Sequence, residues 1–329
     1  MAARINPWWL IPISVVAFAA IGGGLRARIP QADDWRAAVA AIRAELKPGD
    51  GVTWAPYALG EGRIHFGDLP VFHADPLSET DLSRYDRVFV MGAAGHDADE
   101  LPSEHTLEAR TRYGALTVDR VRVGGERVVG DLYATLESAT VSRSGASGDP
   151  RVCDFFSGSG WHCDLRDDAE TTRRCLALPI AQRWQQRQKN PDCGLDPSLH
   201  VSRDVRLIGG VPRRCIYFHP VAAAAVRLSW SAAPAGERLV VSGGFSDPMV
   251  ADNYPKAIRV QPLKLVVSRG GAVLRELDVP AEKGWFRHEI ELPEGTAPID
   301  FVLTGPSPTD ADFCFDPVIQ TSRAEGQAP

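Results

Sequence analysis

The sequence predicts an α+β protein of two domains, in which a small three-layer α/β domain precedes an antiparallel, jelly-roll-like β-sandwich, with one N-terminal transmembrane helix or signal peptide. Three observations predict this. Residues 5–25 carry no charge, residues 32–137 alternate short apolar runs with polar segments of helix length, and residues 201–320 contain regularly spaced strand-like segments. The predicted boundaries are 1–31 for the N-terminal segment, 32–137 for the α/β domain, 138–152 for a linker, 153–200 for an irregular segment with cysteines, 201–320 for the sandwich and 321–329 for a disordered tail.

Composition excludes several classes of protein. The 329 residues include 36 Lys and Arg against 42 Asp and Glu, a net charge of −6. Since no cluster of basic residues is dense enough to follow a phosphate backbone, we expect no nucleic-acid partner. Hydrophobic residues make up 44% and charged residues 24% of the chain, which is ordinary globular usage and excludes general disorder.

The N-terminal segment 5–25 has the length of a membrane span. At about 1.5 Å per residue such a helix crosses a hydrocarbon layer of about 30 Å, with Trp8 and Trp9 at its interface. A cleaved signal peptide is the alternative, because Arg4 precedes the apolar run and Ala17-Phe18-Ala19 resembles a cleavage site; a buried core helix is a third interpretation.

The compartment is predicted from two opposing signals. Arginines that follow the apolar run favour a cytoplasmic body by the positive-inside rule, whereas six cysteines favour an oxidising compartment. We give the cysteines more weight. Because Arg, Ala and Gly are abundant and Lys is scarce, as in high-GC bacteria, we expect a single-pass protein of a bacterial inner membrane with its C-terminal body in the periplasm or at the cell surface.

The α/β domain is predicted element by element. Asp33 or Asp34 caps a first helix of apolar residues at helical spacing, and Pro48-Gly49 ends it. Short apolar runs between helix-length polar segments predict parallel strands with crossovers. A second helix is expected from Ser103 to Tyr113. The extended segments are expected at 51–54, 69–72, 86–91, 115–123 and 127–133.

Polar and aromatic side chains follow the ends of these strands, where ligands bind in parallel α/β sheets. The candidate ligand-binding residues are Trp54, Tyr57, His73, Asp75, His96 and Asp97. Gly92 and Gly95 match neither the dinucleotide motif nor the P-loop, so no cofactor is predicted. The residues from His96 onward suit cation binding or acid–base work, but a solvated acidic loop explains them equally, and no metal site is predicted.

This region resembles a known family. A membrane helix, Asp34-Trp35-Arg36, Lys47-Pro48-Gly49-Asp50 and Tyr85-Asp86-Arg87-Val88-Phe89-Val90 occur in the order found in the soluble extracytoplasmic domain of bacterial polyprenyl-phosphate-sugar glycosyltransferases, the protein O-mannosyltransferase and aminoarabinose-transferase superfamily. The segment 121–133 is similar to the closing strands of that domain, and the resemblance covers about residues 8–135. It implies an accessory role beside a membrane glycosyltransferase. The family's catalytic acidic residues lie between early membrane helices, so no catalytic residue is carried over.

The second half begins after a Ser- and Gly-rich break at 142–150. All six cysteines follow it, at Cys153, Cys163, Cys175, Cys193, Cys215 and Cys314. Without a C-x2-C pair a zinc site is not expected. We predict three disulfides of open connectivity; unpaired core cysteines are the alternative.

Nine strand-like segments predict the sandwich. They lie at 205–208, 214–218, 223–230, 238–242, 258–268, 272–277, 285–292, 299–304 and 313–319. Alternation is clear in Val226, Leu228 and Trp230. Short strands without intervening helices are typical of an antiparallel sandwich. Residues 200–320 resemble carbohydrate-binding modules in layout only.

The predicted function follows from these features. Sugars bind flat aromatic faces beside planar polar side chains, so the sandwich candidates are Asp252, Asn253, Tyr254 and Trp285, although each also fits a core or surface role. No hydrolase or metalloprotease motif is present, and no catalytic residue is assigned. We expect a membrane-anchored, exported envelope protein that acts as a binding or accessory module for a glycan or glycolipid. The alternatives are a structural partner of a separately encoded membrane glycosyltransferase and a carbohydrate-active hydrolase.

Overall fold

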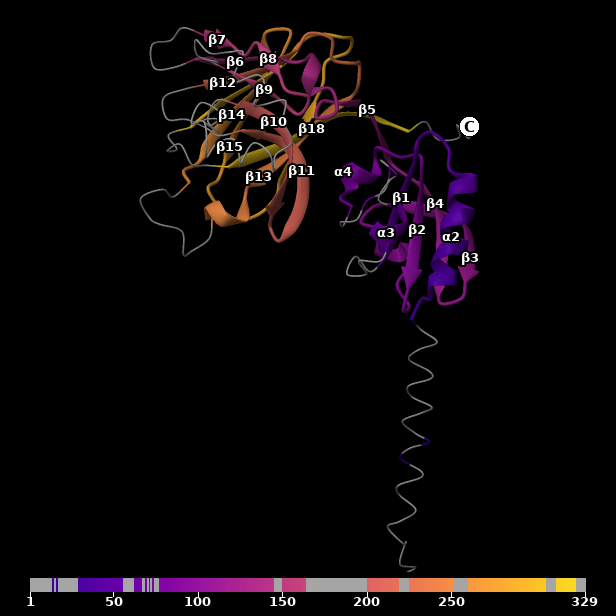
Figure 1. Cartoon of the computed structure of the whole chain (residues 1–329). Coiled ribbons are helices and arrows are strands. Elements are labelled where there is room, and N and C mark those ends of the chain that lie inside the picture. Colours follow the sequence, from indigo (N-terminus) through magenta and orange to yellow (C-terminus); the bar gives the residue numbers. More distant parts are fainter. Residues whose placement is uncertain are drawn as a thin grey trace, which may run out of the picture. The chain divides into compact units, whose positions relative to one another are not determined.

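The chain forms two compact units (Figure 1). The computed structural model describes residues 29–55, 62–66, 69, 71, 73, 77–144, 150–163, 200–218, 225–250, 260–305 and 312–323, together with Ser14 and Val16. The first unit is Met1–Arg127 with Arg323–Pro329, and the second is Val128–Ser322. This division differs from the predicted one, because the expected linker 138–152 lies inside the second unit. There, β6 (Thr140–Ser144) and β7 (Pro150–Val152) are paired strands.

The first unit contains a mixed sheet of order β1-β2-β4-β3. Its strands are β1 (Asp50–Ala55), β2 (Arg87–Ala93), β3 (His105–Tyr113) and β4 (Leu116–Val123). β1 and β2 are parallel and are joined by a crossover that holds α3 (Gly62–Phe66) and α4 (Glu79–Leu82). β2, β4 and β3 are antiparallel neighbours. The prediction of parallel strands is therefore correct for the first pair only.

Apolar clusters cover both faces of this sheet. Helix α2 (Ala32–Glu45) begins after Gln31, whose backbone N–H donates to Asp34 Oδ2 at 3.0 Å, so the helix starts earlier than the predicted cap. It buries Trp35 and Ile42 against Phe89 and Met91 of β2. The alternate β2 residues, Val88 and Val90, belong to a second cluster with Leu82 of α4. Because successive strand residues point to opposite faces, the sheet is the middle layer of three.

The predicted helix from Ser103 to Tyr113 is wrong, because His105–Tyr113 is strand β3 at the edge of the sheet. A two-residue turn joins β3 to β4, with Tyr113 opposite Leu116. Threonine and tyrosine in this stretch favour extended backbone, and pairing with β4 provides the ladder of hydrogen bonds. Most β3 side chains are exposed or half-buried, which is why the segment lacks a clear apolar period.

The second unit is a β-sandwich. One sheet has the order β16-β13-β18-β11-β10-β9-β8 with β5 also paired to β18, and the other has the order β15-β14-β17-β12-β6-β7. The remaining bounds are β5 (Glu126–Asp131), β8 (Phe155–Phe156), β9 (Gly160–His162), β10 (His200–Ile208), β11 (Val211–Phe218), β12 (Ala225–Trp230), β13 (Arg238–Phe245), β14 (Leu263–Arg269), β15 (Ala272–Val279), β16 (Phe286–Glu291), β17 (Ile299–Thr304) and β18 (Phe313–Ser322). Each of the nine predicted segments overlaps one of β10 to β18, which confirms the predicted sandwich.

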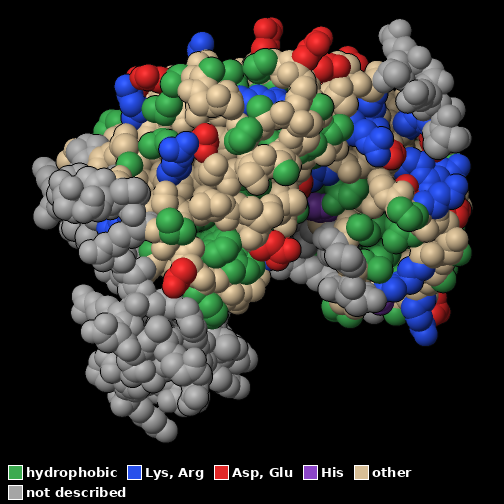
Figure 2. Space-filling view, turned by 90° about the horizontal axis from the view of Figure 1, so that it is seen from above, with side chains coloured by type: hydrophobic (Ala, Val, Ile, Leu, Met, Phe, Trp, Pro, Cys, Tyr) green, Lys and Arg blue, Asp and Glu red, His purple; other side chains and the backbone are tan. Residues whose placement is uncertain are grey.

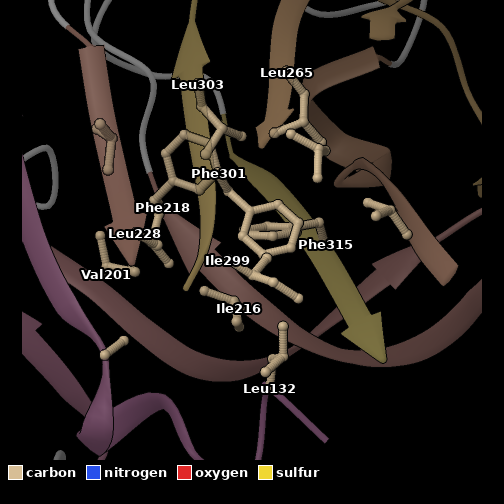
Figure 3. Close-up of a cluster of buried hydrophobic side chains, with 14 of the residues drawn as sticks. Leu132, Val201, Ile216, Phe218, Leu228, Leu265, Ile299, Phe301, Leu303 and Phe315 are labelled. Atoms are coloured by element: carbon tan, nitrogen blue, oxygen red, sulfur yellow. The ribbon is translucent and has the colours of Figure 1, made fainter. Parts of the chain in front are cut away.

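Figure 2 shows acidic side chains among basic ones on the surface of the face drawn. Apolar side chains from both sheets fill the sandwich interior. The rings of Phe218 and Phe315 have centroids 6.2 Å apart, and those of Phe301 and Phe315 are 5.5 Å apart (Figure 3). Trp230 packs edge-on against Phe301 at 5.7 Å. This rigid core holds the side chains on the outer side of each strand in fixed positions.

No helix among the described residues is long and apolar enough to cross a membrane. The predicted span 5–25 lies outside the described part of the chain, apart from Ser14 and Val16. The anchor and the localisation built on it therefore stay predictions.

Candidate functional site

The loop after β2 folds back tightly over the end of its own strand. Ala94 and Gly95 have φ values of 57° and 95°, and His96 N–H donates to Ala93 O at 3.0 Å, as in a type I′ turn. A left-handed φ is uncommon for alanine. A Cβ at Gly92 would lie 2.2 Å from His96 O, so only glycine lets the loop approach this closely. The predicted candidates His96 and Asp97 come from this loop.

A cavity of about 210 Å³ lies between this loop and the β3–β4 hairpin. The hairpin contributes Arg110, Arg112 and Thr117 to its lining, and the loop contributes His96 and Asp97. Arg112 is opposite Thr117 and Arg110 is opposite Asp119 in the strand register, so these side chains share one face of the sheet. The cavity therefore joins residues that are close in the sheet but separated in sequence.

A buried carboxylate holds the wall of the cavity. The Asp119 side chain is 0% exposed, and its carboxylate accepts hydrogen bonds from Arg110 Nε at 2.6 Å and Arg110 Nη2 at 2.7 Å. It also accepts Ala98 N–H at 3.1 Å. Arg110 Nη2 reaches Asp97 Oδ2 as well, at 2.9 Å. Hydrogen bonds and charge from Asp119, and then from Asp97, raise the pKa of Arg110, which stays a cation and clamps the loop to the sheet.

His96 lies at the rim, where its Nδ1 pairs with a carboxylate oxygen of Glu100, four residues later in the loop. Both side chains are about 40% exposed, at 43% and 40%. The exposure of His96 and Glu100 fits the interpretation as a solvated loop. Asp97, the next residue, lines the cavity and is held by Arg110. Among the described residues, no group of three or more His, Cys, Asp or Glu side chains is arranged to hold a metal ion.

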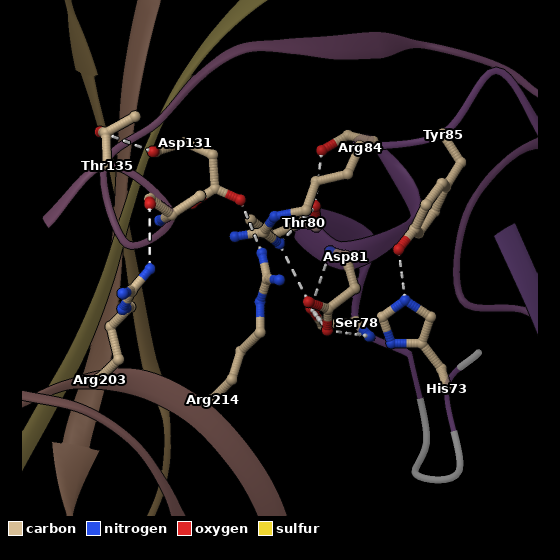
Figure 4. Close-up of polar contacts among 12 residues, drawn as sticks. His73, Ser78, Thr80, Asp81, Arg84, Tyr85, Asp131, Thr135, Arg203 and Arg214 are labelled. Carbon is tan, nitrogen blue, oxygen red and sulfur yellow. Dashed lines mark hydrogen bonds and ion pairs between the residues drawn. The ribbon is translucent and has the colours of Figure 1, made fainter. Parts of the chain in front are cut away.

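The other first-unit candidates lie elsewhere. Trp54 is 2% exposed and packs in the core cluster against α2, so it does not line the cavity beside His96 and Asp97. Half-buried His73 has its Nε2 2.5 Å from the Tyr85 hydroxyl, as Figure 4 shows, and its backbone N–H donates to Val52 O at 2.9 Å. Tyr57 and Asp75 lie outside the described residues. Of the candidates in this unit that the structure describes, it therefore brings only His96 and Asp97 together at a cavity.

The sandwich carries a second group of candidate side chains. Trp285 precedes β16, is half-buried, and packs against a small apolar cluster of Ile208, Cys215, Tyr217 and Cys314. Cys215 and Tyr217 alternate along β11 with Ile216 and Phe218 of the sandwich core, so this cluster lies on the outer face of the sheet.

Arginine side chains stack over both aromatic rings of this face. The Arg213 guanidinium lies 5.7 Å from the Trp285 ring centroid, and that of Arg206 lies 4.0 Å from the Tyr217 ring. The Tyr217 hydroxyl donates to Asp312 Oδ1 at 2.7 Å. Burial, and after it the charge of Asp312, raises the pKa of Tyr217, so its hydroxyl stays a donor. These contacts were absent from the sequence-based prediction.

The loop that carries Trp285 is held close to the sheet. A Cβ at Gly244 of β13 would lie 2.2 Å from Gly284 O, so the glycine lets the Gly284-Trp285 backbone cross directly over the strand. The nearby β10–β11 turn is also fixed, because Asp247 accepts the N–H groups of Gly209 at 2.6 Å and Gly210 at 2.7 Å. Asp252, Asn253 and Tyr254, the other sugar-binding candidates, lie outside the described residues.

Two disulfides belong to the sandwich. Cys153 pairs with Cys163 and Cys215 pairs with Cys314, with sequence separations of 10 and 99. These pairs confirm the disulfide prediction for four of the cysteines. Cys175 and Cys193 lie outside the described part of the chain. The Cys215–Cys314 bond joins the neighbouring strands β11 and β18 within the outer cluster, to which both cysteines belong.

Comparisons with known proteins give no family. No protein-family model matches the sequence, and no curated protein matches it. Among solved structures, the chain is similar to the tandem family 51 carbohydrate-binding modules of a family 98 glycoside hydrolase from Streptococcus pneumoniae, at 10% identity and a TM-score of 0.30, over 63% of this chain and 56% of that one. It is also similar to a family 51 module of Clostridium perfringens in complex with methyl-galactose, at 10% identity and a TM-score of 0.24, over 36% of this chain and 72% of that one.

A third similar structure holds the second family 51 module and the INT domains of ZmpB from Clostridium perfringens. The identity is 13% and the TM-score 0.28, over 37% of this chain. The match spans only 26% of the length of that structure. Carbohydrate-binding modules are thus among the structural neighbours of the chain.

Proposed function

We propose that the chain is an exported, membrane-anchored envelope protein that binds a glycan or glycolipid on the outer face of the sandwich. The observation that carries the proposal is the half-buried Trp285 ring with the Arg213 guanidinium 5.7 Å from its centroid. An indole face buries the apolar face of a sugar ring, and a planar guanidinium donates to its hydroxyls. The two groups are therefore close enough together to contact the apolar face and a hydroxyl of the same sugar.

The support beneath Trp285 favours binding over a merely structural role. A sugar-binding platform needs rigid side chains, because each one that is ordered on binding costs free energy. The ring rests on the apolar cluster that the Cys215–Cys314 bond joins, and the loop at Gly284 is pressed against Gly244. Asp204 and Asp312, which contact Arg206 at 2.7 and 3.7 Å, add carboxylate acceptors on the same face.

The test uses the full chain in mild detergent on immobilised envelope glycans. We expect at least one glycan to bind, and Trp285→Ala to weaken that binding by about tenfold, since loss of a stacked ring costs about 1.4 kcal/mol. Trp285→Phe keeps a ring and is expected to lose less. Arg238→Ala is the matched control, because Arg238 lies at the start of β13 and pairs with Glu289 at 3.1 Å. Absence of binding to every glycan, or equal binding by Trp285→Ala, would contradict the proposal.

The membrane anchor and the glycosyltransferase association complete the proposal. Residues 5–25 would hold the protein at the membrane, and the resemblance over residues 8–135 favours a separately encoded membrane glycosyltransferase as its neighbour. Purification of the tagged full chain from membranes tests both. A multi-span transferase in the eluate supports the association, and recovery of the chain from the soluble fraction would contradict the anchor.

A further inference from the structure

We infer that the cavity between the loop after β2 and the β3–β4 hairpin binds a small oxyanion, a phosphate or carboxylate group, through Arg112. The site lies in the first unit and shares no residue with the glycan face of the sandwich. It therefore goes beyond the proposed function and stands or falls separately from it.

Arg112 provides an available guanidinium. Its Nε donates to Gly114 O at 2.9 Å, which directs the side chain along the hairpin. Its two Nη groups make no hydrogen bond or ion pair with the residues that the structure describes, and Arg112 lines the cavity. Paired N–H groups on a planar fork match the two oxygens of a carboxylate or phosphate.

Of the two arginines in the lining, Arg110 is held in ion pairs and Arg112 makes none with a described residue. Arg110 is already shared by Asp119 at 2.6 Å and Asp97 at 2.9 Å. Asp97 Oδ1 accepts Asp99 N–H at 3.0 Å, so both of its oxygens are engaged. Arg110 thus offsets the charge of one of the two carboxylates that it contacts, and an incoming anion meets, beside this cluster, the Arg112 guanidinium, which makes no ion pair with a described residue.

Two more groups are placed to complete the site. The Thr117 hydroxyl makes only a long bond to Gly92 O, at 3.4 Å, and can turn to donate to a ligand. His96 lines the cavity while Glu100 holds its Nδ1, which leaves Nε2 as the second ring nitrogen at the rim. Both lie in the same lining as Arg112.

The shape of the cavity sets the size of the ligand. The cavity volume of about 210 Å³ is below the roughly 300–1,000 Å³ of pockets that enclose drug-sized ligands. This suits an anionic group or one acidic monosaccharide, not a nucleotide or a peptide. Gly92 lines the cavity, and the loop can lie this close to it because a Cβ there would be 2.2 Å from His96 O.

Isothermal titration of the full chain in detergent tests the inference with three probes, namely inorganic phosphate, acetate and neutral methyl-galactose. We expect phosphate or acetate to bind, and whichever binds identifies the preferred oxyanion. Arg112→Gln should weaken that binding at least tenfold, because a hydrogen bond to a charged group is lost. Arg112→Lys keeps the charge without the fork and should give an intermediate loss.

Arg122→Gln is the matched control. Arg122 lies on the same hairpin and pairs with Glu108 at 2.6 Å, outside the cavity lining. Thr117→Val should also weaken binding while keeping the side-chain volume, and unchanged urea midpoints show that each variant is folded. No binding of either anion to the natural chain, or an equal loss in Arg112→Gln and Arg122→Gln, would overturn the inference. Glycan binding that depends on Trp285 would survive either result.

Discussion

The Cys215–Cys314 bond is expected to stabilise the sandwich more than the Cys153–Cys163 bond, because it closes a much longer loop. A cross-link stabilises a protein largely by removing entropy from the unfolded chain, and the loss grows with the logarithm of loop length. For the separations of 99 and 10 residues, the loop-closure relation gives about 4.7 and about 2.7 kcal/mol. The expected difference between the two bonds is therefore about 2 kcal/mol.

Urea unfolding of two double variants measures this difference. Cys215→Ala with Cys314→Ala removes the long-loop bond, and Cys153→Ala with Cys163→Ala removes the short-loop bond. All four positions are buried, with at most 4% exposed, so alanine is a comparable replacement in each. With a urea dependence of about 2 kcal/mol per M, the midpoints should differ by about 1 M. Thiol titration confirms that the other bond is intact. Equal midpoints, or a lower midpoint for the short-loop variant, would refute the loop-length reasoning.

Two further predictions concern polar groups of the sandwich. Tyr217→Phe removes the donor to Asp312 and should lower the free energy of unfolding by about 1.5–3 kcal/mol, measured by urea denaturation; an unchanged value would mean that water replaces the hydroxyl. Burial, followed by the charge of Arg275, lowers the pKa of His288 below its ordinary value of 6.5, so the unfolded chain binds this proton more readily than the folded one. His288 should thus favour the folded state fully above that pH and progressively less as the pH falls below 6.5, and His288→Gln should flatten the decrease in urea midpoint between pH 7.5 and 5.5. The same decrease in both proteins would exclude His288 as its source.

The sandwich was predictable because its strands have one buried and one outer face. Val226, Leu228 and Trp230 are 5%, 0% and 3% exposed, while Arg227 between them is largely exposed. Such alternation records the strand period directly in the sequence. It does not specify which strands are neighbours. The order of each sheet depends on long-range pairing that no local pattern encodes.

The first sheet was harder to predict because both of its faces are covered. β1 is buried along its whole length, with polar Thr53 as buried as Trp54, so no alternation of buried and exposed residues shows that Trp54 belongs to the core. An aromatic residue at the carboxyl end of a strand then looks like a binding residue. Continuous burial also hides strand direction, so the general prediction of parallel strands could not show that β4 pairs antiparallel to β2.

The cavity shows how an error in secondary structure conceals a site. In the predicted helix over 103–113, Arg110 and Arg112 would lie about 200° apart around the helix axis, on different faces, and neither would be linked to Thr117. In strand β3 the two arginines are two residues apart and share one face, where the register sets them opposite Asp119 and Thr117. The loop that carries His96 and Asp97 could be predicted from the sequence because it directly follows an apolar strand. Arg110 and Arg112 on the opposite side of the cavity could not, because their position depends on the β3–β4 hairpin. If the arginines of the cavity lining bind the anion, Arg112→Gln will weaken anion binding. Arg122→Gln, on the other face of the same hairpin, will leave it unchanged.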